Sequence, residues 1–311
     1  MTILSVSNVT KRYAHHTALD GVSIEVPDQS IFGLLGPNGA GKTSLIRIIN
    51  QITGPDEGEI FFKGEKLSPH HVSHIGYLPE ERGLYRKIEV GEQALYLAQL
   101  KGMSRSEALK KLKYWFEKFE IIGWWKKKVE ELSKGMQQKV QFIVTVLHQP
   151  DLLILDEPFT GFDPINANLV RDELLALRKN GTTIILSTHR MESVEEMCSH
   201  IALINKSKKI LEGAVNEIRR RFRTQTYEVQ YEGNNIAFAN ALGSNLKLLD
   251  VNNEHEYIVS KVQSLNNNSP NELLKMLIPH VEIHSFRELL PTMNEIFIQS
   301  VNQTTEENEP A

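Results

Sequence analysis

Residues 36–43 read Gly-Pro-Asn-Gly-Ala-Gly-Lys-Thr, and this segment is the most informative part of the sequence about the fold. It matches the pattern GxxxxGK[ST] of a phosphate-binding loop, or P-loop. An apolar run, residues 31–35, precedes it, and a helical pattern with Leu45, Ile46 and Ile49 on one side follows. The glycines allow the backbone to curl so that several N–H groups point inward, and with the helix start they form an anion site. The sequence therefore predicts a strand, a phosphate-binding loop and a helix, in that order.

The residue types in the loop indicate which phosphates it holds. Lys42 supplies a positive charge for the β- and γ-phosphates of ATP, and the hydroxyl of Thr43 is placed to ligate Mg²⁺. The residues predicted to bind ATP here are Gly36, Pro37, Asn38, Gly39, Ala40, Gly41, Lys42, Thr43 and Ser44.

A second element of the same chemistry lies at residues 152–157, Leu-Leu-Ile-Leu-Asp-Glu. An apolar run that ends in two carboxylates predicts a buried strand leading to a polar site. Asp156 is predicted to hold Mg²⁺ together with Thr43. Glu157 is placed to orient or deprotonate the water that attacks the γ-phosphate. The alternative, two exposed acids at a strand end, is disfavoured by the phosphate-binding loop in the same chain.

The remaining patterns outline the domains. Residues 3–26 alternate apolar and polar side chains and predict strands joined by a turn. From about residue 88, Lys, Glu, Ala and Leu at helical spacing predict an inserted helical subdomain, which we assign to about residues 83–137. Strands and helices then alternate over residues 152–204, which predicts an α/β fold with a parallel sheet covered on both faces.

A different unit follows the basic run at residues 219–223, which either contacts anionic lipid or forms the exposed face of a linking helix. The order strand, helix, strand, strand, helix, strand predicts a ferredoxin-like α+β domain, with a last helix near residues 292–301. The polar, acidic end of the chain predicts disorder. The predicted domains are residues 1–218 for the ATPase, 219–301 for an accessory domain and 302–311 for a disordered tail.

Composition narrows the class of protein. The chain has 311 residues and a net charge of -4, which argues against a protein that coats nucleic acid. Its one cysteine, Cys198, allows no internal disulfide and fits a reducing compartment. No apolar run approaches the ~20 residues that cross a bilayer, and the first residues lack the layout of a signal peptide. We therefore predict a cytoplasmic protein that reaches a membrane through a partner.

Residues 132–137, Leu-Ser-Lys-Gly-Met-Gln, resemble the LSGGQ signature of ABC ATPases. Over about residues 1–218 the chain is similar to that family. The resemblance implies a P-loop NTPase (RecA-like) core with an N-terminal antiparallel β subdomain, an inserted helical subdomain and, beyond them, the small ferredoxin-like domain. It also implies that Tyr13 stacks on adenine and that Glu80 lies in the Q-loop. The signature residues are Ser133, Lys134, Gly135 and Met136, and Asp163 lies in the D-loop. His189 is the switch histidine, and it acts beside the catalytic Glu157 and Lys42.

Some positions depart from the family pattern. Lys134 replaces a glycine and Met136 a glutamine. Glu80 replaces the Q-loop glutamine, and its carboxylate can accept a hydrogen bond or bind Mg²⁺ but cannot donate. These changes resemble a bacterial subgroup whose separate type-2 membrane permeases form exporters, including sodium and drug efflux systems.

The resemblance also implies partners. In the family a signature contacts the ATP held by a second subunit, so we expect a head-to-tail dimer of this chain with two ATP molecules sandwiched between the copies. We expect a separate membrane permease at the inner face of the cell membrane, and no nucleic acid. The alternative, a soluble ABC ATPase acting on ribosomes or DNA, is disfavoured because the chain holds one cassette and no long coiled coil.

Two further clusters leave their interpretation open. His70, His71 and His74 form a group that either binds a metal or lies in an exposed loop. Trp124 and Trp125, followed by three lysines, form either a membrane-surface patch or a packed aromatic pair beside solvated charges. A further alternative is that part of this helical subdomain forms the groove for a coupling helix of a membrane subunit.

Overall fold

The computed structural model describes residues 1–81, 83–243, 246–254, 256–266 and 269–306. The chain divides into two compact units. The first comprises Met1–Val215 together with the end of the chain from Ser300, and the second comprises Asn216–Gln299. Each unit is described by itself.

The first unit is built on a six-stranded sheet in the order β10-β9-β3-β8-β7-β6. Its strands are β3 (Ile31–Leu35), β6 (Ile75–Leu78), β7 (Leu152–Asp156), β8 (Thr183–Ser187), β9 (His200–Asn205) and β10 (Lys208–Ala214). All pair in parallel except β10, which runs antiparallel to β9. Every residue of β3, β7 and β8 is buried, as expected for strands covered on both faces. The predicted α/β core is confirmed.

Helices and a second sheet complete this core. The helices are α1 (Lys42–Ile49), α5 (Pro164–Lys179) and α6 (Met191–Met197). A further helix, α7 (Val215–Arg221), begins at Val215, and its other residues belong to the second unit. The second sheet is antiparallel, in the order β2-β1-β4-β5, as the resemblance implied. Its strands are β1 (Thr2–Tyr13), β2 (His16–Pro27), β4 (Glu57–Phe62) and β5 (Glu65–Lys66). The inner faces of both sheets share one apolar core with α1.

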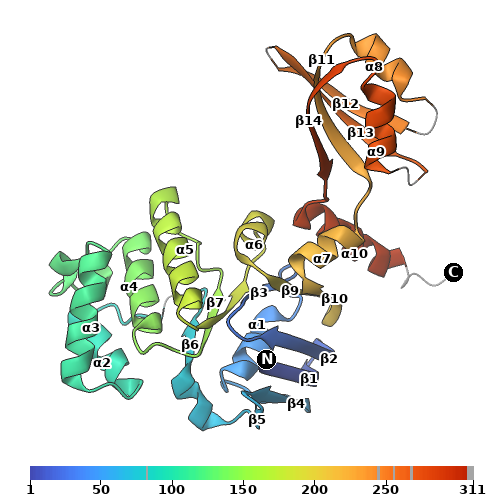
Figure 1. Ribbon diagram of the computed structural model, residues 1–311. Coiled ribbons are helices and arrows are strands. Elements are labelled where there is room, and N and C mark those ends of the chain that lie inside the picture. Colours follow the sequence, from blue (N-terminus) through green and yellow to red (C-terminus); the bar gives the residue numbers. More distant parts are fainter. Residues whose placement is uncertain (82, 244–245, 255, 267–268, 307–311) are drawn as a thin grey trace. The chain divides into compact units, whose positions relative to one another are not determined.

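The helical subdomain inserts between β6 and β7 (Figure 1, green). It contains α2 (Val90–Leu100), α3 (Arg105–Lys118) and α4 (Lys134–Val146), with two short 3₁₀ turns between α3 and α4. The ring of Trp125 packs 5.5 Å from that of Phe116 and against Gly91, where an added Cβ would lie 2.3 Å from the indole. Trp125 is therefore part of the packing of this subdomain.

The second unit has the strand order β12-β13-β11-β14, all antiparallel. Its elements are β11 (Thr226–Glu232), α8 (Asn235–Ala241), β12 (Leu246–Glu254), β13 (Tyr257–Ser264), α9 (Pro270–Leu277) and β14 (Glu282–Leu289). The predicted ferredoxin-like order is therefore confirmed. The last helix, α10 (Met293–Glu306), extends five residues into the segment predicted to be a disordered tail, and residues 307–311 of that tail lie outside the described residues.

Candidate active site

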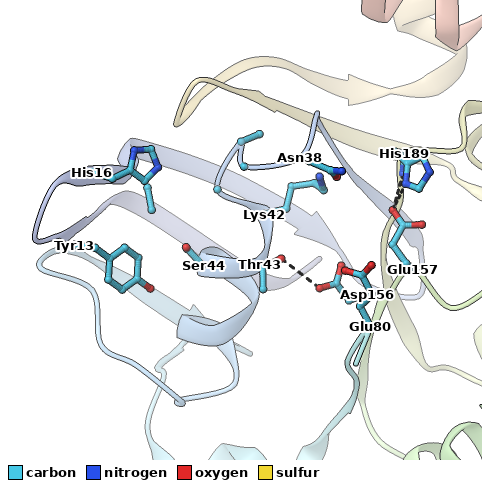
Figure 2. A pocket seen from close by; sticks show the side chains of 14 residues that line it. Tyr13, His16, Asn38, Lys42, Thr43, Ser44, Glu80, Asp156, Glu157 and His189 are labelled. Atoms are coloured by element: carbon cyan, nitrogen blue, oxygen red, sulfur yellow. Dashed lines mark hydrogen bonds and ion pairs between the residues drawn. The ribbon is translucent and has the colours of Figure 1, made fainter. Parts of the chain in front are cut away.

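The first unit contains a cavity of 290 Å³ at the carboxyl ends of β3 and β7 (Figure 2). The residues that line it are Tyr13, His16, Ala18, Asn38, Gly39, Ala40, Gly41, Lys42, Thr43, Ser44, Glu80, Asp156, Glu157 and His189. Tyr13 and His16 lie at one end, and Glu157 and His189 lie at the other. Segments far apart in the sequence thus converge on one site.

The phosphate-binding loop depends on glycine at positions where neighbouring backbone is close. Gly36 and Gly41 have φ values of 147° and 115°. A Cβ would lie 2.1 Å from the carbonyl oxygen of Ile204 at Gly36, and 2.2 Å from that of Ala18 at Gly41. Both conformation and space therefore exclude a side chain.

Lys42 lies at the start of α1 and folds back over the loop. Its Nζ donates to the carbonyl oxygens of Gly36 at 2.7 Å and Pro37 at 3.1 Å. Burial lowers the pKa of Lys42, and the carboxylates of Asp156, Glu157 and Glu80 oppose that shift. A buried ammonium at the mouth of a glycine-rich loop is suited to a phosphate.

The oxygen atoms of Thr43 and Asp156 meet on the floor of the cavity. Thr43 Oγ1 lies 3.5 Å from Asp156 Oδ2 (Figure 2). Asp156 is 4% exposed, and burial raises the pKa of its carboxyl. A buried carboxylate is stabilised by a cation, and a donor set of hydroxyl and carboxylate oxygens fits Mg²⁺. Glu80, which follows β6, lines the same cavity.

Glu157 is held by the segment that follows β8. Its Oε1 accepts from the backbone N–H of His189 at 2.9 Å and from His189 Nδ1 at 2.7 Å. Its Oε2 accepts from Thr188 Oγ1 at 3.2 Å. Because an ionised carboxylate accepts only, Nδ1 carries the hydrogen of the ring contact. Glu157 also has a φ of 49°, and such left-handed backbone in a residue with a Cβ is often found at functional sites.

Some residues of this cavity were not predicted. His16 faces Tyr13 across the β1–β2 hairpin and lines the cavity with Ala18. Thr188 contacts Glu157 directly. A predicted hairpin between residues 13 and 16 would have placed His16 beside Tyr13. The contact of Thr188 follows from the left-handed turn at Glu157, and no sequence pattern indicates that turn.

The signature and the D-loop lie elsewhere. Ser133 caps α4 by accepting from the N–H of Met136, and Asp163 caps α5 by accepting from the N–H of Asn166. The hydrogen bonds from the backbone N–H and the side-chain amide of Asn166 lower the pKa of Asp163. Among the described residues, the predicted ATP contacts outside the cavity are Ser133, Lys134, Gly135, Met136 and Asp163, together with Gly36 and Pro37, which lie in the loop itself. An added Cβ on Gly135 would lie 3.1 Å from the carbonyl oxygen of Gly161, so signature and D-loop are neighbours.

A second cavity, of 600 Å³, lies between the core and the helical subdomain. The residues that line it are Pro69, Val72, Ser73, Tyr77, Pro79, Gly83, Leu84, Leu97, Leu100, Lys101, Gln141, Val144, Thr145 and His148. We call it the subdomain groove. Gln141 Nε2 lies 3.5 Å from the carbonyl oxygen of Glu81, so one wall of the groove contacts the segment that carries Glu80.

The histidine cluster is arranged as a hydrogen-bond network. Glu65, His70 and His71 are close enough together to share a metal ion. However, His71 Nδ1 accepts from the N–H of Ser68, so its Nε2 carries the hydrogen and faces Glu65 at 3.4 Å. A metal needs a nitrogen lone pair at that atom. His74 pairs instead with Asp151 at 3.0 Å.

Family models match two parts of the chain. The model described as "ABC transporter" matches residues 19–160, and the one described as "ATP-binding protein DrrA1-3-like, C-terminal domain" matches residues 213–301. The first match spans the phosphate-binding loop, the signature and both carboxylates, and the second spans the ferredoxin-like unit.

Relatives and solved structures agree with these matches. An uncharacterized ABC transporter ATP-binding protein of Bacillus subtilis, YhaQ, is 41% identical over 98% of this chain and 100% of its own length. The Nod factor export ATP-binding protein I of Cupriavidus metallidurans is 34% identical over 70% of this chain and 72% of its own. A solved ATP-binding subunit of an ABC transporter, 30% identical, covers 71% of this chain and 93% of its own with a TM-score of 0.67.

Proposed function

The chain belongs to the ATP-binding proteins of ABC transporters, and on that premise we propose that it drives an exporter whose membrane-spanning part is a separate permease. ATP binding and hydrolysis are the activities of this family. The observation that carries the proposal is the convergence of Lys42, Asp156, Glu157 and His189 on one cavity. The roles of the individual residues in ATP binding and hydrolysis are part of this proposal.

ATP binding begins at the phosphate-binding loop. The backbone N–H groups of the loop and the ammonium of Lys42 hold the β- and γ-phosphates. Tyr13, which is 44% exposed at the far end of the cavity, offers its ring to the adenine. The ring of Tyr13 is partly exposed, with Lys11 Nζ 5.7 Å from its centroid, and an exposed aromatic face is suited to stacking on a base.

We assign Mg²⁺ to the oxygen atoms of Thr43, Asp156 and Glu80. A bound ion neutralises charge on the phosphates. The raised pKa of Asp156 indicates that the buried carboxylate lacks sufficient compensation in the protein itself. A divalent cation would provide that compensation.

Hydrolysis requires a group that handles the proton of the attacking water. Glu157 is adjacent to Asp156 and buried, and one of its oxygens is held by His189. We propose that Glu157 orients and deprotonates the water, and that His189 keeps Glu157 in place and contacts the γ-phosphate. Lys42 stabilises the charge that develops on the transferred phosphoryl group.

A second copy of the chain completes each site in this proposal. Ser133, Lys134 and Asp163 are exposed and lie outside the cavity of their own chain. Ile165, beside Asp163, is 81% exposed. An exposed helix start outside the cavity of its own chain is suited to a partner that brings a phosphate. The exposed side chain of Ile165 is suited to an apolar contact with such a partner.

The subdomain groove supports a membrane partner. Leu84, Leu97 and Leu100 give it apolar walls, and Leu100 is 64% exposed. A short amphipathic helix fits a groove of this kind. Pro79 lies in the groove and Glu80 in the ATP cavity, so an occupant that shifts this segment also shifts a carboxylate at the nucleotide. We propose that the occupant is a cytoplasmic helix of the permease.

Membrane attachment then depends on the permease. None of the described helices combines the length and the apolar character that a bilayer span requires. The direction of transport is proposed from the relative that is named for Nod factor export. Residues 213–301 match the C-terminal domain of DrrA-like ATP-binding proteins, so the chain resembles known ATP-binding proteins in its second unit as well as in its first.

The test is capture of the tagged chain from membranes solubilised in mild detergent, with Leu100→Arg and Leu109→Arg as a matched pair. Both leucines are exposed on the helical subdomain, but Leu100 alone lines the groove. We expect a multi-span protein at a one-to-one ratio with the wild type and Leu109→Arg, and its loss with Leu100→Arg. Capture of ribosomes or nucleic acid without any membrane protein would support the soluble ABC ATPase instead.

A further inference from the structure

A hairpin turn contacts the phosphate-binding loop through a backbone hydrogen bond. The turn joins β9 to β10 and consists of Lys206 and Ser207, between the paired residues Asn205 and Lys208. Lys206 has a φ of 45° and Ser207 a φ of 69°. A two-residue hairpin with both central φ values positive normally carries Asn-Gly or Gly-Gly, because side chains disfavour this conformation. Contacts elsewhere must therefore hold the turn in place.

Ser207 provides these contacts. Its N–H donates to the carbonyl oxygen of Ala40, in the phosphate-binding loop, at 3.2 Å. Its Oγ donates to the carbonyl oxygen of Thr17 at 2.5 Å, and its own carbonyl accepts from the N–H of Asp20 at 2.9 Å. With an exposure of 6%, Ser207 ties the hairpin, the start of β2 and the loop together without solvent between them.

The phosphate-binding loop is packed tightly against the two segments that Ser207 joins. Gly36 lies against the end of β9 and Gly41 against the start of β2, each too close for a Cβ. The loop is therefore enclosed by the two segments that Ser207 joins. Tightly packed backbone transmits small shifts, so displacement of the turn changes the direction of the N–H groups that face the phosphates.

We propose that Ser207 is a positioning residue of the phosphate site, which sets the affinity for nucleotide by fixing the backbone around Ala40. Its Oγ holds the strained turn, and the turn holds the loop. Ser207 touches neither the γ-phosphate nor the attacking water in this account. The inference rests on the assignment of residues 36–43 as the phosphate site.

Ser30 offers a matched control. Its Oγ donates to the carbonyl oxygen of Pro27 at 2.6 Å, and it is also 6% exposed. It lies at the amino end of β3, the opposite end of that strand from the loop. Replacing either serine by alanine removes one buried hydroxyl and one hydrogen bond to backbone.

The experiment measures binding of ATP by calorimetry, steady-state ATPase kinetics and thermal unfolding for the full chain, Ser207→Ala and Ser30→Ala. We expect both variants to unfold at lower temperature. Ser207→Ala should also raise Kd and KM for ATP about fivefold, which is the change expected from the loss of one hydrogen bond. Its kcat should stay within about twofold of wild type. Ser207→Gly also lacks the hydroxyl but accepts a positive φ, so it should raise Kd less than Ser207→Ala does, and it serves if the latter fails to fold.

The outcomes separate the possibilities. Unchanged Kd in both Ser207 variants, with lowered thermal stability, would make Ser207 a scaffold residue only and overturn the proposal. Equal loss of affinity in Ser30→Ala would attribute the effect to general destabilisation and would also overturn the proposal. Lys42→Ala tests the underlying assignment, since its failure to weaken ATP binding would contradict the phosphate site rather than the role of Ser207.

Discussion

Asp156 and Glu157 are adjacent in the chain but lie in different settings. Asp156 has buried carboxylate oxygens near Thr43, whereas Glu157 accepts hydrogen bonds from Thr188 and His189. The backbone turn at Glu157, with its φ of 49°, separates the two side chains. One carboxylate is thus suited to a cation and the other to a water molecule.

At this scale we predict that Glu157→Gln retains ATP binding and loses at least ~100-fold of the ATPase rate, because an amide cannot accept the proton of water. Gln keeps the size of the side chain and an oxygen for the N–H of His189. Thermal stability should therefore stay close to that of wild type. Steady-state phosphate release and ATP binding by calorimetry measure the two effects, and near-normal turnover would contradict the assigned role.

Asp156→Asn should lose ATPase activity by at least ~100-fold and yet stabilise the nucleotide-free chain. Burial raises the pKa of Asp156, so its charged form opposes folding at neutral pH. That cost disappears as the pH falls through the raised pKa, because the carboxyl then takes up a proton. Unfolding temperatures of the variant and wild type, measured from neutral to acidic pH, should converge. A variant less stable than wild type at neutral pH would count against this reasoning.

The sequence predicted the individual residues of the cavity well where a motif fixed both residue type and backbone. Lys42, Thr43, Asp156 and Glu157 all line it. His16 and Thr188 were missed because their contacts depend on a hairpin pairing and on a left-handed turn. Asp163 was predicted from its motif position, and a motif does not reveal that its carboxylate caps α5.

At the scale of elements, the helical subdomain depends on a close contact between α2 and the segment before α4. Gly91 donates its N–H to the carbonyl oxygen of Trp125 at 2.9 Å, and the indole covers its Cα. The lysines that follow Trp125 also left a surface patch open as an interpretation, because composition does not show which face of an aromatic ring is covered.

Gly91→Ala should therefore destabilise the chain by about 1–3 kcal/mol, the cost of overpacking, although alanine favours a helix. Gly123→Ala is the control, since an added Cβ there meets no atom within 4 Å. Chemical unfolding of both variants measures the difference. Equal stabilities would contradict the described packing.

Element order was predictable in both units because strands and helices differ in their apolar periods. The ferredoxin-like order of the second unit follows from such patterns alone. Strand neighbours such as β3 between β8 and β9 were not predictable, because pairing depends on contacts between distant segments. The extension of α10 to Glu306 was missed because the polar composition of its last turn resembles that of a disordered tail.

At the level of the whole molecule, we propose that each ATP site is formed by two copies of the chain. Ser133→Arg should leave ATP binding by a single chain unchanged and abolish ATP-driven dimerisation, because a bulky side chain would occupy the place of the partner's phosphate. Ser104→Arg is the control, since Ser104 likewise caps its helix by accepting from the N–H of Glu107. Dimerisation that survives in Ser133→Arg would contradict the placement of the signature at the interface.

The most direct measurement is the mass of Glu157→Gln in solution by light scattering, with and without Mg²⁺ and ATP. This variant should bind ATP without consuming it, so a shared ligand would persist. We predict the mass of one chain without ATP and twice that mass with ATP. A mass of one chain while calorimetry shows ATP bound would contradict the claim that two copies complete each site.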